Sequence, residues 1–111
     1  MAAGIAPVDR GDAVDWLEGR LARPRPGGAH LICHTVAWQY FPADRQARGR
    51  RIIEAAGAAA TDDAPLAWFG MEADEVPGSA ALTLRLWPGD HRLSMGRADF
   101  HGRWVEWDAG P

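Results

Sequence analysis

The sequence has a single cysteine, no lysine and no long apolar run. One cysteine, Cys33, excludes an internal disulfide and a multi-cysteine metal site. A membrane-spanning helix needs about 18 or more consecutive apolar residues, which the chain lacks. The N-terminus has neither the basic start nor the long apolar stretch of a signal peptide. We therefore expect a cytoplasmic protein that does not insert into a membrane.

The charge balance also excludes a class of partner. All of the 12 basic residues are arginine, and the formal net charge is −3. Because nucleic-acid binding needs a basic face, we expect no nucleic-acid partner. Arg45, Arg48, Arg50 and Arg51 form a local basic run that could meet an anion. Such a run is more typical of the solvated face of a helix.

The residues that are present fit one small domain. A length of 111 residues with 47% hydrophobic residues allows a real core without cross-links. Residues 1–8 are expected to form a disordered or loose tail, and residues 9–111 a single α/β domain. Six tryptophans are many for this length. Because an indole N–H needs a partner, several of them should line the edge of the core or an interface.

The pattern of apolar residues and breakers predicts a small mixed sheet of about four strands with two helices. The expected elements are a helix from Asp9 or Asp12 to about Ala22, a strand over 30–36, a loop over 38–42, a helix over 43–60, and strands over 66–71, 81–87 and 91–97. The strand–helix–strand part implies a parallel crossover, and the last two strands an antiparallel hairpin.

The first predicted strand determines how the sheet should be covered. Residues 30–36 are almost continuously apolar, which favours a strand buried on both faces. Two helices are few for such a sheet, so one edge and part of one face should lack cover. An uncovered edge invites pairing with another chain. We therefore expect a homo-oligomer formed through a sheet edge or a tryptophan-rich surface.

Three segments carry a resemblance to a known family. Residues 33–40, 65–68 and 96–102 are similar to the bacterial domain-of-unknown-function 2332 family, and the resemblance extends from about Asp12 onward. Family members are longer, which implies that this chain corresponds to their C-terminal part. The resemblance implies no established activity.

A more distant resemblance concerns topology. The order of elements is similar to the C-terminal half of a Rossmann-like, S-adenosylmethionine-dependent methyltransferase, an analogy at the level of the fold. It implies that the strand before Trp38 would face the methyl donor and acceptor. The glycine-rich loop and the acidic ribose ligand of such a donor site have no counterpart here. We therefore expect no cofactor for the isolated chain, and S-adenosylmethionine only in full-length relatives.

The candidate site residues cluster after the first strand. His34 ends the apolar run and Thr35 follows it, where ligands bind in open α/β sheets. His34 could act as a general base or a hydrogen-bond donor, or simply bond a neighbouring backbone group. Trp38, Gln39 and Tyr40 could grip a flat ring or a cationic methyl donor. Their alternative role is a hydrophobic plug for the end of the sheet.

A second candidate group lies near the C-terminus. Asp99, His101 and Arg103 alternate along the chain, so a carboxylate could orient the histidine or share a ligand with it. No third metal ligand stands at a diagnostic spacing, and no metal site is predicted. An interaction between Asp99 and Arg103 that fixes a turn is the simpler interpretation.

Two hypotheses for function follow from these residues. The favoured hypothesis for the isolated chain is a non-catalytic or partial module that self-associates. The alternative is a methyltransferase-like enzyme fragment that retains the acceptor-side residues around His34 and Tyr40. Whether the chain is an enzyme is left open by the sequence.

Overall fold

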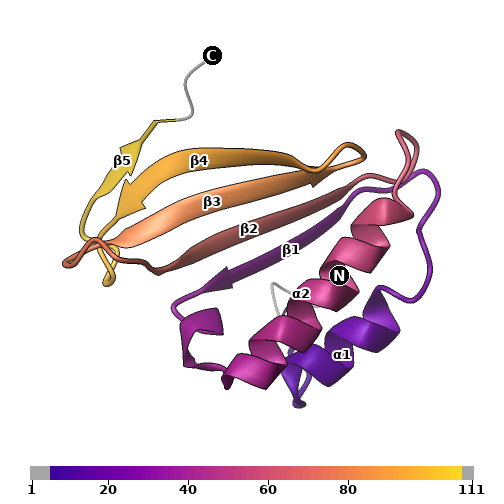
Figure 1. Ribbon diagram of the computed structural model, residues 1–111, viewed down its shortest axis with the longest axis horizontal. Coiled ribbons are helices and arrows are strands. Elements are labelled where there is room, and N and C mark those ends of the chain that lie inside the picture. Colours follow the sequence, from indigo (N-terminus) through magenta and orange to yellow (C-terminus); the bar gives the residue numbers. More distant parts are fainter. Residues whose placement is uncertain (1–5, 109–111) are drawn as a thin grey trace.

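The computed structural model describes residues 6–108 and contains a mixed α/β fold (Figure 1). In chain order the elements are α1 (Ala13–Arg20), β1 (His30–Thr35), the short 3-10 helix η1 (Trp38–Tyr40), α2 (Ala43–Ala58), β2 (Leu66–Ala73), β3 (Ala80–Trp87), β4 (His91–Ala98) and β5 (Val105–Trp107). The predicted tail over residues 1–8 lies mostly outside the described residues.

The strands form one sheet in the order β1-β2-β3-β4-β5. The pair β1 and β2 is parallel, and every following pair is antiparallel. The predicted parallel crossover and C-terminal hairpin are therefore confirmed. The sequence predicts about four strands, and β5 makes five. Gly96 permits the fifth strand, because a Cβ at this position would collide with the Glu106 carbonyl oxygen.

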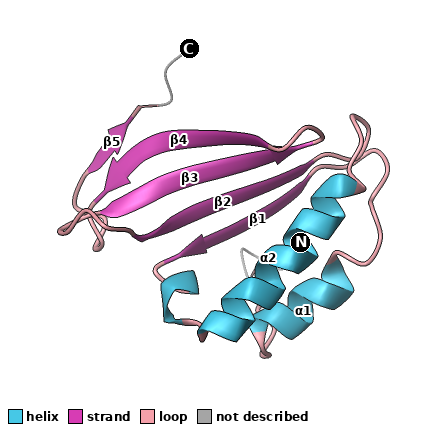
Figure 2. Ribbon diagram, in the orientation of Figure 1, coloured by secondary structure: helices cyan, strands magenta, loops and turns pink. Residues whose placement is uncertain are grey.

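Both α-helices pack on the same face of the sheet (Figure 2). Asp12 caps α1 by accepting hydrogen bonds from the backbone N–H groups of Val14 and Asp15. Val14 and Leu17 are the buried residues of this helix. Arg45 and Arg48 of α2 form ion pairs with acidic side chains at or near α1, namely Asp12, Asp15 and Glu18. Part of the basic run thus joins the two helices, while about a third of the Arg45 and Arg48 side chains stays exposed.

Two glycines let α2 approach the large indoles of the core. A Cβ on Gly49 would lie 2.6 Å from the Trp38 ring, and a Cβ on Gly57 would lie 2.5 Å from the Trp87 ring. Both glycines and both tryptophans are buried. Glycine lowers helix stability by about 1 kcal/mol relative to alanine, so these two positions exchange helix propensity for close packing.

The prediction that β1 is buried on both faces is wrong. Its residues alternate between half-buried and exposed, with Ile32 and His34 turned towards the helices. Leu31, Cys33 and Thr35 are exposed on the other face. The reason is the cover, because the helices in the described part of the chain lie on one face only (Figure 2). No helix of the described residues is long and apolar enough to cross a membrane.

Candidate functional site

Parallel pairing brings the carboxyl ends of β1 and β2 together, and Glu72 occupies this point. Its carboxylate accepts hydrogen bonds from three successive backbone N–H groups. The Ala37 N–H contacts both oxygens, the Trp38 N–H contacts Oε2 and the Gln39 N–H contacts Oε1, at 2.9–3.3 Å. The Nδ1 atom of His34 lies 2.5 Å from Glu72 Oε2. Glu72 therefore joins β2 to β1 and to the start of η1, an arrangement that we call the Glu72 clasp.

His34 is fully engaged inside this clasp. Its Nε2 atom accepts a hydrogen bond from the indole N–H of Trp68 at 2.8 Å. Since Nε2 accepts, the proton of the neutral ring sits on Nδ1 and is donated to Glu72. The ring also stacks on Trp38, with centroids 5.1 Å apart. General-base catalysis by His34 would first require Trp68 to release Nε2.

A strained residue sets the direction of the loop that the clasp holds. Val36 has a φ of 47°, in the left-handed region that a β-branched residue rarely adopts. Its backbone N–H donates to the Met71 carbonyl at 2.7 Å. This turn aims three successive N–H groups at Glu72. Strain of this kind costs about 1–3 kcal/mol and persists only where surrounding interactions hold it.

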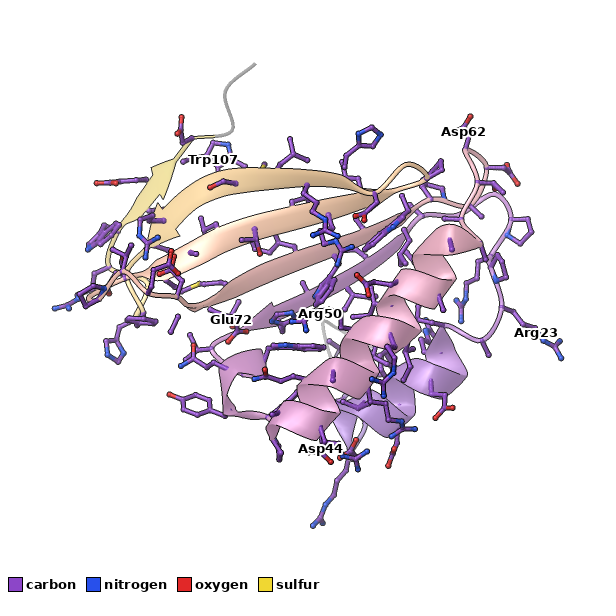
Figure 3. All side chains as sticks on the ribbon, in the orientation of Figure 1. Arg23, Asp44, Arg50, Asp62, Glu72 and Trp107 are labelled. Atoms are coloured by element: carbon purple, nitrogen blue, oxygen red, sulfur yellow. The ribbon has the colours of Figure 1, made fainter. Side chains whose placement is uncertain are left out.

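Beside the clasp, an open groove of about 520 Å³ runs between α2 and the helix-facing side of β2, β3 and β4. Its lining includes the aromatic Trp38 and Trp68, the hydroxyls of Thr83 and Ser94, and the arginines Arg50, Arg85 and Arg92. Arg50 reaches from α2 and Glu72 from the end of β2 (Figure 3). The groove is large enough for a small organic molecule.

Arg85 makes the most extensive ion pairs of the three groove arginines. It donates to Glu54 at 3.0 Å and to both oxygens of Asp90 at 2.9 and 3.0 Å. Hydrogen bonds from Arg85 and then Arg92 lower the pKa of Asp90 to about 2, so this carboxylate is ionised at neutral pH. The Arg85 guanidinium also lies over the Trp87 ring, 4.7 Å from its centroid. Arg85 therefore supports the wall of the groove.

The other predicted residues of the first cluster take different positions around His34. Gln39 uses its side-chain oxygen to accept the Ala73 N–H at 2.7 Å, so it ties η1 to the end of β2. Thr35 points to the opposite face of the sheet. Tyr40 is 72% exposed and takes no part in the clasp. Trp38 is buried against His34 and Trp68, the position expected of a plug.

The C-terminal candidates form a turn. Asp99 is 5% exposed and accepts hydrogen bonds from the backbone N–H groups of His101 and Arg103 and from the Arg103 guanidinium. The Arg103 side chain, with these backbone bonds, lowers the pKa of Asp99 to about 2. In the sheet order β2 and β3 separate this turn from β1, so it does not meet His34. Among residues 6–108, no three metal-ligating side chains converge.

Sequence reasoning missed Glu72 and Trp68, which hold the two ring nitrogens of His34. A signal for Glu72 was available, because it is the one charged residue of the second predicted strand and its continuation. Its meaning depends on the parallel register that places it beside His34, which residue patterns do not specify.

One comparison with known proteins gives a match. The family model described as "Uncharacterized protein conserved in bacteria (DUF2332)" matches residues 1–107. No curated protein and no solved structure matches the chain.

Proposed function

The chain belongs to the DUF2332 family of bacterial proteins, and from its geometry we propose that this domain is a self-associating module. It pairs with a second copy through the sheet face that carries no helix. The observation that carries the proposal is an uninterrupted apolar row on that face. Both ring nitrogens of His34 are meanwhile engaged by Glu72 and Trp68, so neither is free to act on a substrate.

The apolar row crosses four neighbouring strands. Cys33 of β1 pairs with Phe69 of β2, Phe69 with Leu84 of β3, and Leu84 with Leu93 of β4. The adjacent row places Leu31 beside Ala67, Leu86 and His91. Leu31 is 63% exposed and Leu93 is 43% exposed. We call these two rows the open face.

The size of the open face is consistent with a pairing surface. Strands lie about 4.8 Å apart and rise about 3.3 Å per residue, so two alternate rows across four strands span about 19 Å by 13 Å. A patch of this size, about 250 Å², is somewhat smaller than the largest apolar patches on ordinary monomers. The exposed Trp104, Val105 and Trp107 beside β4 extend the apolar surface towards the area of a standard interface.

The chemistry of the open face favours a second copy as its occupant. None of the residues of its two rows is an aspartate, a glutamate or an arginine, so two copies can meet without repulsion between such charges. A two-fold axis makes the same patch serve both partners. Sheets that pack face to face in this way form a shared core about 10 Å thick.

Light scattering across protein concentrations tests this proposal. We expect a mass that rises from 12.1 kDa towards twice that value as concentration increases. Leu93→Arg places a charge on the open face and should weaken association roughly tenfold or more. Ser94→Arg is the matched control, because Ser94 pairs with Thr83 on the side of the sheet from which Arg85 reaches Glu54 of α2. A wild-type protein that stays monomeric at millimolar concentration, or equal effects of the two variants, would refute the proposal.

The single thiol gives an independent measurement. Cys33 lies in the apolar row and is exposed in one copy of the chain. Pairing through the open face should bury it and slow its alkylation as protein concentration rises. Association with an unchanged alkylation rate would place the contact elsewhere and contradict the use of this face.

A second candidate is the methyltransferase-like fragment, and it is favoured only by the groove beside His34 and Trp38. This groove carries charges of both signs, from Arg50 and Arg92 and from Glu72 and Asp74, so its charge does not select for the cationic sulfonium of S-adenosylmethionine. Calorimetry with S-adenosylmethionine, on this chain and on a longer family member, decides the question. Absence of binding to the longer protein at millimolar ligand would eliminate this candidate.

A further inference from the structure

The two hydrogen bonds of the His34 ring make the position of Trp68 dependent on protonation. In the neutral ring, Nδ1–H donates to Glu72 Oε2 over 2.5 Å, and Nε2 accepts from the Trp68 indole N–H at 2.8 Å. A second proton can bind only at Nε2, because this atom holds the remaining lone pair. An indole N–H donates and cannot accept, so Nε2–H would face another donor. The bond to Trp68 therefore exists only while His34 is neutral.

A different acceptor stands beside the same nitrogen atom. Gly70 lies between His34 and Thr83 in the register of the sheet. A Cβ on Gly70 would lie 2.9 Å from His34 Cε1, 3.5 Å from His34 Nε2 and 3.4 Å from Thr83 Oγ1. The imidazole and the hydroxyl thus border one small space that glycine leaves open. Thr83 lines the groove, and its hydroxyl oxygen can accept an N–H that the neutral ring does not have.

The charges that face His34 act in both directions. The charged residues that line the groove with it are Glu72 on β2, Asp74 just after β2, Arg50 on α2, Arg85 on β3 and Arg92 on β4. Glu72 contacts the ring directly and favours a second proton, whereas the three arginines across the groove oppose it. Trp38 of η1 stacks on the ring and carries no charge. Because the groove is open, protons from solvent can reach the imidazole.

We propose that His34 is a pH-operated switch in the wall of the groove. The neutral ring holds the Trp68 indole, and the ring that has taken a second proton from solvent releases Trp68 and donates Nε2–H to Thr83. Glu72 accepts from Nδ1–H in both states, so the ring stays in place. Since Trp68 and Thr83 both line the groove, the switch changes the surface that a ligand there would meet. These residues lie on the helix-facing side of the sheet, so the switch is independent of pairing through the open face.

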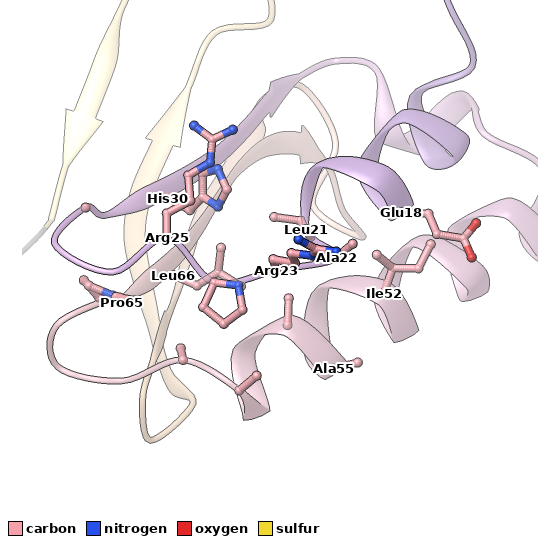
Figure 4. Close-up of a pocket in the computed structure, with 16 residues that line it drawn as sticks. Glu18, Leu21, Ala22, Arg23, Arg25, His30, Ile52, Ala55, Pro65 and Leu66 are labelled. Carbon is pink, nitrogen blue, oxygen red and sulfur yellow. The ribbon is translucent and has the colours of Figure 1, made fainter.

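The other histidine of β1 provides an internal reference. His30 lines a separate cavity of about 300 Å³ at the opposite end of β1 and β2, where both helices end (Figure 4). Burial, then the charges of Arg25 and Arg20, lower the pKa of His30. Its Nε2 atom makes no hydrogen bond within residues 6–108. His30 should therefore stay neutral to lower pH than an ordinary histidine, and no indole depends on it.

An NMR titration of the unmodified chain tests the switch over the range in which histidines ordinarily change charge, about pH 8 to pH 5. The ring ¹⁵N resonances of His34 and the indole ¹H resonance of Trp68 should move together with one midpoint. The indole proton should shift upfield as its hydrogen bond is lost. Trp68→Phe identifies the resonance by its disappearance, while the Trp16 indole and the His30 ring should not follow the transition. Protonation of His34 with an unmoved Trp68 resonance, or no second proton on His34 in this range, would overturn the proposal.

A pair of histidine variants assigns the transition to one ring. A glutamine in place of His34 can still donate to Glu72 and accept from Trp68, but it does not titrate, so His34→Gln should leave the Trp68 resonance independent of pH. His91→Gln is the matched control, because His91 is exposed at the start of β4 and should leave the transition unchanged. A transition that persists in His34→Gln, or that disappears in His91→Gln, would assign the switch to another group. If His34→Gln does not fold, the titration of the unmodified chain decides the question.

Thr83→Val tests the second acceptor. This change removes the hydroxyl and keeps the branched shape, so the midpoint of the Trp68 transition should move to lower pH by about one unit, as expected when a hydrogen bond to a charged group is lost. Ser94→Ala is the control, because Ser94 is the register partner of Thr83 and lines the same groove. An unmoved midpoint in Thr83→Val, or equal shifts in the two variants, would overturn the assignment of Thr83 as the partner of the protonated ring.

Discussion

The Glu72 clasp makes a quantitative prediction for the variant Glu72→Gln. In the wild type each carboxylate oxygen faces N–H donors: Oε1 accepts from Ala37 and Gln39, and Oε2 from Ala37, Trp38 and His34. A glutamine amide must put its NH₂ group in one of these two places. Either orientation points donors at donors, so backbone N–H groups in a half-buried setting lose their acceptor.

The histidine cannot relieve this conflict. If His34 moved its proton to Nε2 so that Nδ1 could accept from the new amide, Nε2–H would face the indole N–H of Trp68. An unpaired buried donor costs about 1–3 kcal/mol. With two donors affected and some access to water, we expect Glu72→Gln to lower the free energy of unfolding by about 2–4 kcal/mol.

Equilibrium unfolding in urea measures this loss. Glu75→Gln is the control, because Glu75 lies on the exposed turn after β2 and should change stability by less than about 0.5 kcal/mol. The ¹⁵N chemical shifts of His34 provide a second check, with the proton expected on Nδ1. A loss below about 1 kcal/mol for Glu72→Gln, or a proton on Nε2, would show that the clasp is not assembled as described.

Two further outcomes follow from contacts elsewhere in the fold. Gly57→Ala gains helix propensity but forces a methyl group to 2.5 Å from the buried Trp87 ring, so thermal unfolding should show a net loss of up to about 2 kcal/mol. Gly19→Ala in α1 meets no atom within 4 Å and should instead stabilise the protein by about 0.5–1 kcal/mol. Arg103 lowers the pKa of Asp99 from 3.8 to about 2, so the stability that this carboxylate contributes is full above about pH 3.8 and is lost as the pH falls towards 2. Asp99→Asn should remove that part of the acid sensitivity in unfolding curves measured between pH 5 and pH 2, and an unchanged pH dependence would contradict the role of Asp99.

The helices and longer strands could be predicted because each has a local cause. Pro24, Pro26 and the two glycines after them end the first helical region, and β3 alternates leucines with polar residues. The turn after β3 and the partner strand β4 follow from this alternation and from Pro88-Gly89. The three-residue β5 has no such pattern, and its pairing depends on the room that Gly96 leaves for Glu106.

The errors concern relations between distant residues. The apolar run of β1 was interpreted as burial on both faces, but the same residues are needed for an apolar row on an open face. A one-dimensional pattern cannot distinguish a face covered by a helix from a face available to a partner. His34 was placed correctly at a strand end, yet its function in the fold depends on Glu72, 38 positions away.

The strain at Val36 leads to one more consequence of the clasp. If the hydrogen bonds to Glu72 hold Val36 at a φ of 47°, then breaking them in Glu72→Gln lets the loop relax and recover part of that strain. A Val36→Gly background has no strain to recover, because glycine adopts positive φ freely. Glu72→Gln should therefore cost about 1 kcal/mol more in that background than in the wild type. A double-mutant cycle in urea measures the difference, and additivity within about 0.3 kcal/mol would mean that Glu72 does not maintain the strained turn.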